Sequence, residues 1–198
     1  MFIYLKSIKF FIISLIVILL NGCSSTNMKD FENKTPKLNL FEFFKGDTVA
    51  YGIFEDRFGK LRRQFRVKIN GSVDQNILTL DEKFIYDDGE KATRVWKIEK
   101  INDNENFVKY QGSAEDVEGL ATGSSVGNAL NWTYDIYLNI KGSNLKVKFN
   151  DWIYKQDNNV AINRAYVSKF GIDIGSVTLV FLRGKTGKTV SPLNINSW

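Results

Sequence analysis

Two charged residues lie on strand faces that otherwise carry apolar side chains, and they are the first candidates for chemistry. By alternation, Glu82 shares its face with Phe84, and Arg94 shares its face with Trp96. A three-residue loop at 87–89, with glycine in its last place, would join the two segments as a hairpin and set Glu82 opposite Arg94. Either charge would be costly if it were enclosed alone. We therefore expect an inward pair that either fixes the register or lends Arg94 to the acidic head group of a ligand.

A second pair of opposite charges occurs downstream. Asp151 lies on the apolar face of its segment, and Arg164 alternates with Tyr166 and other apolar residues. We expect Asp151 and Arg164 to form another inward pair and, together with Asp116, a polar layer inside an aromatic interior.

Two inward carboxylates could in principle carry out acid–base chemistry such as glycoside hydrolysis. Each has an arginine nearby, however, which should lower the pKa of the carboxyl group and make it a poor acid. The chain has no histidine and a single cysteine, Cys23. Ser–His and Cys–His mechanisms, histidine-ligated metals and internal disulfides are therefore excluded. We expect no metal site and no cofactor, and binding is favoured over catalysis.

The segments that position these residues are short, alternate polar with apolar residues, and end at Gly, Asn or Asp. They predict strands at 48–55, 61–69, 77–86, 90–101, 107–116, 132–140, 145–154, 160–170 and 176–183. The pair Asn70-Gly71 predicts a turn, and a short helix is expected within 38–44.

Short connections favour antiparallel pairing of successive strands. Closure into an all-β, up-and-down antiparallel β-barrel of about nine or ten strands would leave no exposed edge. A two-sheet sandwich is the alternative. A transmembrane barrel is disfavoured, because one face of 61–69 would place Gln64, Arg66 and Lys68 in lipid.

The N-terminus resembles that of an exported bacterial lipoprotein. Lys6 and Lys9 precede an apolar run that ends at residue 20, shorter than the roughly 20 residues of a membrane-spanning helix. Gly22-Cys23 follows and is similar to the lipobox, in which the cysteine is lipidated. We expect a signal peptide at 1–22, a lipidated Cys23 with a flexible tether to residue 39, and a barrel domain at 40–198. A plain secreted protein, or a tether that belongs to the fold, is the alternative.

The expected location is the cell envelope. Ser24, rather than an aspartate, follows Cys23, which favours the outer membrane, facing the periplasm. Two or more acyl chains would make the attachment stable. The formal net charge of +5 is spread over interspersed residues of both signs, so no nucleic-acid partner is expected.

The order and spacing of several short motifs resemble the DUF3833 family of bacterial lipoproteins. The motifs are 44–46, 52–59, 80–84 with 88–89, 94–96, 112–117, 127–129, 151–152, 163–165 and 169–171. The resemblance covers Leu40 to Arg183 and implies a lipocalin-like barrel. The family has no established activity, but an association of its genes with neighbours that act on membrane fatty acids implies a lipid-related role.

These observations lead us to expect a lipid-anchored barrel that binds an amphiphilic or fatty-acid-like ligand. The tail would contact inward aromatic residues, and Arg94 or Arg164 would bind the head group. The aromatic candidates are Phe84, Trp96, Tyr134, Phe149 and Tyr166. The alternative is an accessory envelope protein with a solid core. A cavity of about 300 Å³ or more that reaches solvent beside Arg94 would favour binding.

Overall fold

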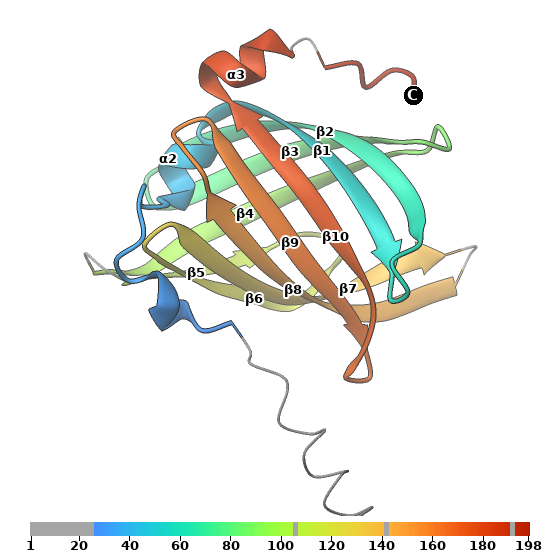
Figure 1. The fold of residues 1–198 in the computed structure, drawn as a ribbon, viewed down its shortest axis with the longest axis horizontal. Helices are drawn as coiled ribbons and strands as arrows, with labels where there is room; N and C mark the ends of the chain where they lie inside the picture. The colour runs from blue at the N-terminus through green and yellow to red at the C-terminus, as the bar shows by residue number, and fades with distance from the viewer. Residues whose placement is uncertain (1–25, 105–106, 141–142, 191–192) are drawn as a thin grey trace, which may run out of the picture.

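The computed structural model describes residues 26–104, 107–140, 143–190 and 193–198. Ten antiparallel strands form a closed barrel in which each strand pairs with its neighbours in sequence and β10 closes against β1 (Figure 1). The strands are β1 (Gly46–Asp56), β2 (Leu61–Asp74), β3 (Ile77–Tyr86), β4 (Lys91–Asn104), β5 (Phe107–Ser113), β6 (Val117–Val126), β7 (Ala129–Ile140), β8 (Ser143–Lys155), β9 (Val160–Lys169) and β10 (Ile172–Arg183). The predicted up-and-down β-barrel is confirmed. The predicted signal peptide and Cys23 lie outside the described residues.

Strand β6 is absent from the sequence-based prediction, and its composition explains why. Its inward positions carry small residues, including Gly123, which pairs with Trp132 of β7. A Cβ at Gly123 would lie 2.2 Å from Cε3 of Trp132, so a bulky inward side chain is impossible there. The strand therefore lacks the alternation of large apolar residues on which the prediction depends.

The turn expected at Asn70-Gly71 is wrong. Strand β2 continues through both residues to Asp74, and the chain turns at Gln75, which has a φ of 52°. Glycine is required at position 71 because a Cβ there would lie 1.7 Å from the carbonyl oxygen of Phe44. Gly71 thus allows a helix to approach the strand rather than turning the chain.

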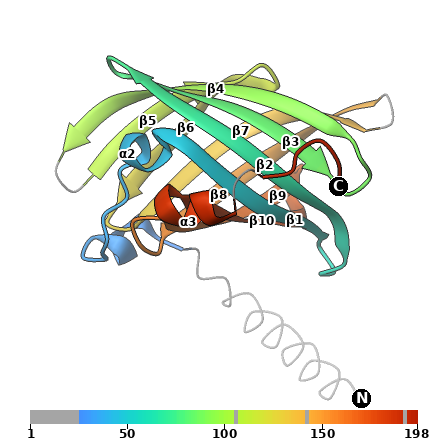
Figure 2. The same ribbon diagram turned by 90° about the horizontal axis from the view of Figure 1, so that it is seen from above.

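That helix, α2 (Leu40–Phe44), blocks one end of the barrel. The Asn39 side chain caps its N-terminus by accepting hydrogen bonds from the backbone N–H groups of Phe41 and Glu42. Phe43 and Phe44 are buried, and the Phe44 ring makes an edge contact with Phe181 of β10 at 5.1 Å. We call this the closed end; Figures 1 and 2 show α2 there.

The segment before α2 also packs against the barrel. In the 3-10 helix η1 (Met28–Phe31), the Phe31 ring lies 5.9 Å from Trp152 and 5.7 Å from Tyr154. Leu38 is buried, and its N–H donates to the Gly127 carbonyl at 2.7 Å. The expected flexible tether is therefore wrong for residues 28–39, because apolar side chains in this segment bind it to the domain. No helix in the described ranges has the length and apolar character needed to cross a bilayer.

The C-terminal residues cover the outside of the barrel. Helix α3 (Gly184–Thr189) contacts β1 and β10, and Figure 2 shows it outside the wall. Beyond it, Leu193 is buried and the Trp198 ring lies 4.5 Å from the Arg66 guanidinium. This arrangement leaves the interior to side chains of the strands and α2.

A smaller buried cluster of Ile136, Val147 and Val167 lies on β7–β9 nearer the opposite end, and the main cluster fills the closed end. Inward side chains there are buried and form one cluster with α2 that includes Val67, Ile69, Leu78, Leu80, Trp96, Ile98, Leu130, Trp132 and Phe181. The opposite end, which we call the open end, carries the β1–β2, β3–β4, β5–β6, β7–β8 and β9–β10 connections. The inward residues nearer this end make up the open half of the barrel.

Candidate functional site

The charged and aromatic side chains on the inner face of the open half keep partial exposure to solvent. The strand register places on this inner face Phe54, Glu82, Phe84, Tyr86, Arg94, Tyr134, Phe149 and Asp151. All of them are half-buried, whereas Val67 and Ile69 on the same inner face are each only 1% exposed. Ile136, Val147 and Val167, also inward and near this end, are only 1–2% exposed, so solvent reaches these charged and aromatic side chains but not the whole of the open half.

The predicted hairpin register is confirmed. Glu82 stands directly opposite Arg94 in the β3–β4 ladder. The Tyr86 N–H donates to the Glu90 carbonyl at 2.9 Å, which closes a three-residue loop whose Gly89 has a φ of 84°. Only glycine adopts this conformation without strain, so the loop fixes the register.

The partner of Arg94 differs from the expected one. The guanidinium binds the Asp116 carboxylate in a bidentate manner, with Nη2 to Oδ2 at 2.6 Å and Nε to Oδ1 at 3.1 Å. Glu82 forms no hydrogen bond or ion pair within the described ranges, so the expected ion pair between Glu82 and Arg94 is wrong. The Asp116 carboxylate accepts hydrogen bonds on both of its oxygens from the Arg94 guanidinium. This two-pronged geometry is stronger than a single contact with Glu82 on the opposite strand.

The short length of β5 places Asp116 beside Arg94. Strand β4 pairs with β5 only over Lys97–Asn104, and β5 ends at Ser113. The β5–β6 turn that follows contributes Asp116 to the flank of β4. A solvent-open pocket of about 380 Å³ lies there, lined by Thr93, Arg94, Val95, Glu115 and Asp116. The barrel wall is therefore bridged at this flank by an ion pair.

Asp151 also has a partner that the sequence did not indicate. Its Oδ1 accepts a hydrogen bond from the Asn163 side chain at 2.8 Å. Its Oδ2 is enclosed and has no hydrogen-bond partner within the described ranges. The Tyr134 hydroxyl lies beside the carboxylate and acts to lower its pKa. Asp151 therefore retains an unused acceptor atom in the barrel interior.

The expected inward placement of Arg164 and Tyr166 is wrong. Strand β9 turns Asn163 and Ala165 inward, so Arg164 and Tyr166 point outward. Arg164 donates to Thr178 Oγ1 at 2.7 Å and lies 3.6 Å from the Glu55 carboxylate, and Tyr166 is 45% exposed. The inward positions of β9 are Ala161, Asn163, Ala165 and Val167, all of them buried.

The interior carboxyl groups bind protons more tightly than the sequence suggested. Burial raises the pKa of Glu82 to about 7, although Arg94 acts in the opposite direction. Burial also raises the pKa of Asp151 to about 6, against the lowering effects of Asn163 and Tyr134. The expectation that neighbouring arginines would lower these pKa values is wrong, because the loss of solvation outweighs the attraction.

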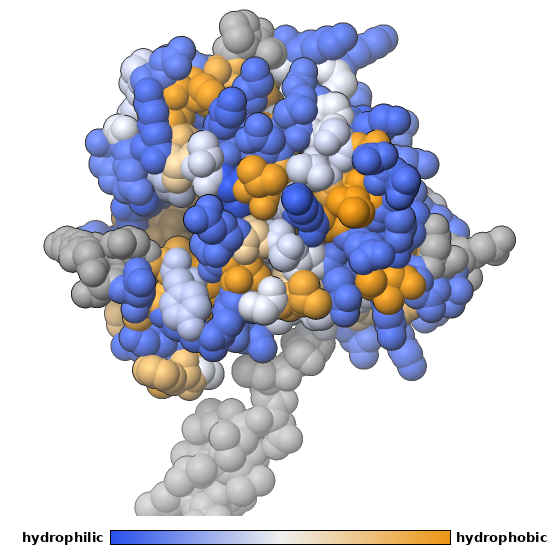
Figure 3. Space-filling model, turned by 180° about the vertical axis from the view of Figure 1, so that it is seen from behind, coloured by the Kyte–Doolittle hydropathy of each residue, from blue (hydrophilic) through white to orange (hydrophobic). Residues whose placement is uncertain are grey.

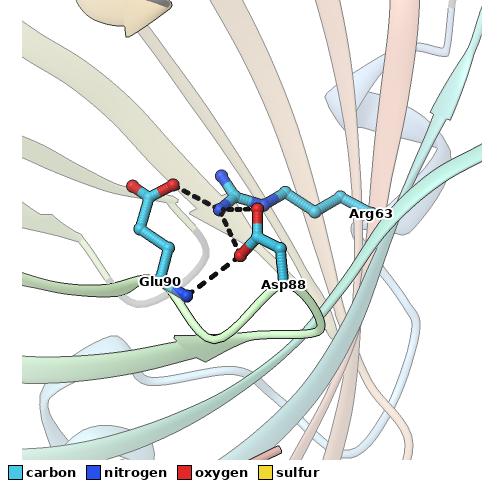
Figure 4. Close-up of polar contacts among 3 residues, drawn as sticks. All are labelled: Arg63, Asp88 and Glu90. Carbon is cyan, nitrogen blue, oxygen red and sulfur yellow. Dashed lines mark hydrogen bonds and ion pairs between the residues drawn. The ribbon is translucent and has the colours of Figure 1, made fainter.

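Arg63 at the open end is a site residue that the prediction missed. Its guanidinium lies 3.5 Å above the centre of the Tyr86 ring and binds Asp88 at 2.9 Å and Glu90 at 2.5 Å. Figure 4 shows its side chain reaching from β2 to the β3–β4 turn. Alternation from the buried Phe65 would have placed Arg63 on the inner face.

The family model for DUF3833, described as a protein of unknown function, matches residues 17–183. The chain belongs to the DUF3833 family. The family resemblance expected from the motifs is thus confirmed. No curated protein sequence matches this DUF3833 chain.

Solved structures resemble the DUF3833 barrel in fold. An S-type phycobiliprotein lyase, CPES, from Guillardia theta has a TM-score of 0.54 at 9% sequence identity, and the match covers 81% of this chain and 99% of the lyase. At this identity the similarity shows the fold alone, which is lipocalin-like as expected. The structure of EF1p2_mFAP2b bound to DFHBI matches at a TM-score of 0.38 and 10% identity, over 72% of this chain and 95% of that one, which is too weak to support an argument.

The DUF3833 structure brings together five of the predicted ligand-binding residues in the open half: Glu82, Phe84, Arg94, Tyr134 and Asp151. Trp96 belongs to the buried core, where its ring contacts Tyr134 at 5.2 Å. No group of three His, Cys, Asp or Glu residues within the described ranges could hold a metal ion. Arg94 is matched by Asp116, so Glu82 and Asp151 leave the interior with an excess of hydrogen-bond acceptors.

Proposed function

We propose that the open half of the barrel binds an amphiphilic small molecule. The observation that carries this proposal is the set of inward aromatic and charged side chains that solvent still reaches. Phe84 and Tyr86 stack at 6.1 Å, and Tyr134 and Phe149 stack at 5.3 Å. These two aromatic pairs offer apolar surface to a ligand tail, and Glu82 and Asp151 lie beside them to contact its polar group.

The pocket beside Arg94 offers a second place for a small molecule, on the flank of β4. Its volume of about 380 Å³ exceeds the roughly 300 Å³ that small-molecule sites require. It opens to solvent at the flank of β4, where Arg94 and Asp116 form its walls. None of the inward aromatic residues lines this pocket, so it offers a polar site beside Arg94 and Asp116 on the flank of β4.

The interior charges favour a polar group that donates hydrogen bonds or carries a positive charge. Arg94 is already paired with Asp116. Within the described ranges, Glu82 has no ion-pair partner and Oδ2 of Asp151 accepts no hydrogen bond. A fatty-acid carboxylate would add a further negative charge to this site, at a cost in free energy. We therefore infer an alcohol, amide or ammonium head group in place of the fatty acid expected from the sequence.

Two experiments test this function. Mass spectrometry of a solvent extract of the natively purified protein should show a stoichiometric amphiphile, and its absence would contradict the proposal. Calorimetric titration with dodecylamine, dodecanol and dodecanoate should give the tightest binding for the amine and the weakest for the carboxylate. Glu82→Gln should reduce the preference for the amine about tenfold, whereas the exposed, outward Glu99→Gln should leave it unchanged.

A proton-transfer role is the second candidate function. The raised pKa of Glu82 suits a group that donates a proton near neutral pH. Recovery of the bound amphiphile chemically unchanged after incubation with the protein would favour binding alone.

We further propose that Cys23 is lipidated and anchors the protein in the outer membrane. Metabolic labelling with a radioactive fatty acid should mark the wild-type protein and not Cys23→Ser. Release of the unlabelled variant into the soluble periplasmic fraction would support the anchor, and equal labelling of both proteins would rule it out.

A further inference from the structure

Large apolar side chains stand in solvent at the tips of two neighbouring hairpins of the open end. Phe58 and Leu61 of the β1–β2 hairpin are 79% and 48% exposed. Phe170 and Ile172 of the β9–β10 hairpin are 93% and 60% exposed. The Arg57 N–H donates to the Ile174 carbonyl at 3.0 Å and ties the two hairpins together. We call Phe58, Leu61, Phe170 and Ile172 the tip patch.

The backbone of both turns is ordered without burying these side chains. In the first turn, the Asp56 carboxylate accepts hydrogen bonds from the N–H groups of Phe58 at 2.9 Å and Lys60 at 3.1 Å. In the second turn, Phe170 has a φ of 52°, a left-handed conformation that is rare for a bulky residue. The packing of the barrel therefore gives no reason for an aromatic residue at either apex.

Basic side chains outnumber acidic ones at the tip patch, where Asp56 and Asp173 carry the negative charges. The Arg57 guanidinium lies 4.7 Å from the centre of the Phe58 ring, and Lys169 Nζ lies 5.2 Å from that of Phe170. Lys60 and Arg62 add positive charge to the first turn, although Arg62 is paired with Asp56 at 2.6 Å. Protruding aromatic rings flanked by basic side chains match the interface of a bilayer with anionic lipid head groups.

A protein partner fits this surface less well. A stable protein interface buries about 800 Å² on each partner around a packed centre, whereas the tip patch consists of side chains on separate projecting turns. Figure 3 shows the molecule from behind, so the β9–β10 turn at the lower right of Figure 1 projects to the lower left. Apolar side chains stand out at that corner of Figure 3.

We propose that the tip patch inserts into the interface of a membrane that contains anionic lipid and thereby presents the open end of the barrel to the bilayer. In Figures 1 and 2, η1 lies at the closed end and the β1–β2 and β9–β10 turns lie toward the other end of the barrel. This docking goes beyond the proposed ligand binding and does not depend on it.

The test uses the full chain in vesicles of phosphatidylcholine with or without phosphatidylglycerol. One variant carries an environment-sensitive fluorescent amino acid in place of Phe170. The control variant carries it in place of Ile77, a residue that is 45% exposed in a hairpin at the closed end. Brominated lipids should quench the fluorophore at position 170 in the anionic vesicles several times more strongly than the fluorophore at position 77. Equal quenching at the two positions, or none at either, would overturn the proposal.

Charge reversal separates docking from ligand binding. The double variant Lys60→Glu/Lys169→Glu should lose most of the quenching at position 170, while Lys97→Glu/Lys109→Glu on the outer face of β4 and β5 should retain it. Both variants should bind dodecylamine as the wild type does. If Lys60→Glu/Lys169→Glu keeps the quenching at position 170, the role of anionic lipid is contradicted. If neither the wild type nor either variant binds dodecylamine, only the proposed ligand is contradicted.

Discussion

Arg94 stands opposite Glu82 in the β3–β4 ladder, yet its guanidinium binds Asp116 on the β5–β6 turn, 22 residues further along the chain. The hairpin thus brings the two charges to one level of the barrel, and the β5–β6 turn supplies the partner of Arg94. Glu82 is left as a partly enclosed carboxyl group whose nearest cation is already occupied.

Removal of the Arg94 charge should destabilise the protein. Arg94→Met leaves Asp116, Glu82 and Asp151 without a compensating cation. We expect the free energy of unfolding to fall by about 2 kcal/mol. This is less than for a fully buried pair, because the Arg94 and Asp116 side chains are partly exposed. Urea unfolding at neutral pH measures the loss. The outward Arg164→Met should cost less than about 0.5 kcal/mol. Equal effects of the two substitutions would show that the interior position of Arg94 has no energetic consequence.

Glu82 should make the protein less stable as the pH rises. Burial raises its pKa from 4.5 to about 7, so the folded state holds a proton that the unfolded state releases between these values. Stability therefore falls as the pH increases through this window. Glu82→Gln should raise the free energy of unfolding by about 1–2 kcal/mol at about pH 8 and change it little at about pH 4, after discounting for solvent in the open half.

Urea unfolding of wild type, Glu82→Gln and Glu99→Gln across this pH range provides the measurement. The surface variant should follow the wild-type curve. A Glu82→Gln curve that runs parallel to wild type at every pH would mean that Glu82 is ionised in the folded protein as it is in the unfolded chain.

Gly71→Ala should displace α2 from the closed end. The new Cβ would lie 1.7 Å from the Phe44 carbonyl oxygen, which is backbone and cannot rotate away. We expect a loss of about 3 kcal/mol and exposure of Phe43 and Phe44. Gly171→Ala is the control, because it meets no atom within 4 Å and has only its positive φ of 78° to strain it.

Urea unfolding and binding of the dye ANS report the two effects of this substitution. The dye should brighten with Gly71→Ala and stay dim with Gly171→Ala. Unchanged dye fluorescence in both variants would show that α2 can adjust its position without uncovering the core.

Gly112 and Trp132 should be energetically coupled. A Cβ at position 112 would lie 2.9 Å from Cζ2 of Trp132, so Gly112→Ala should cost about 1–2 kcal/mol in the wild-type background. In a Trp132→Leu background the clash is removed, and the same change should be neutral or slightly stabilising. A double-mutant cycle of unfolding free energies measures the coupling. Equal costs in both backgrounds would refute the proposed contact.

Much of the fold could be predicted because the strands are long, alternating and joined by short turns. Strand β3 occupies the predicted 77–86, and the loop at 87–89 set the register of Glu82 and Arg94 correctly. Strand β6 could not be predicted, because Trp132 requires glycine and other small residues on its inner face. Arg164 was misplaced because β9 turns its smaller residues, such as Ala165, inward and its larger ones toward solvent.

The sequence alone determined local relationships: which residues alternate on one face, and which positions meet across a tight hairpin. These depend on the period of a strand and the conformation of a few turn residues, and both are encoded within some ten neighbouring positions. The tertiary structure decided which face is inward at β9, that Asp116 binds Arg94, and that α2 fills one end and leaves the other open. Those outcomes depend on the volume and charge that distant strands bring into one enclosed space, which no local pattern specifies.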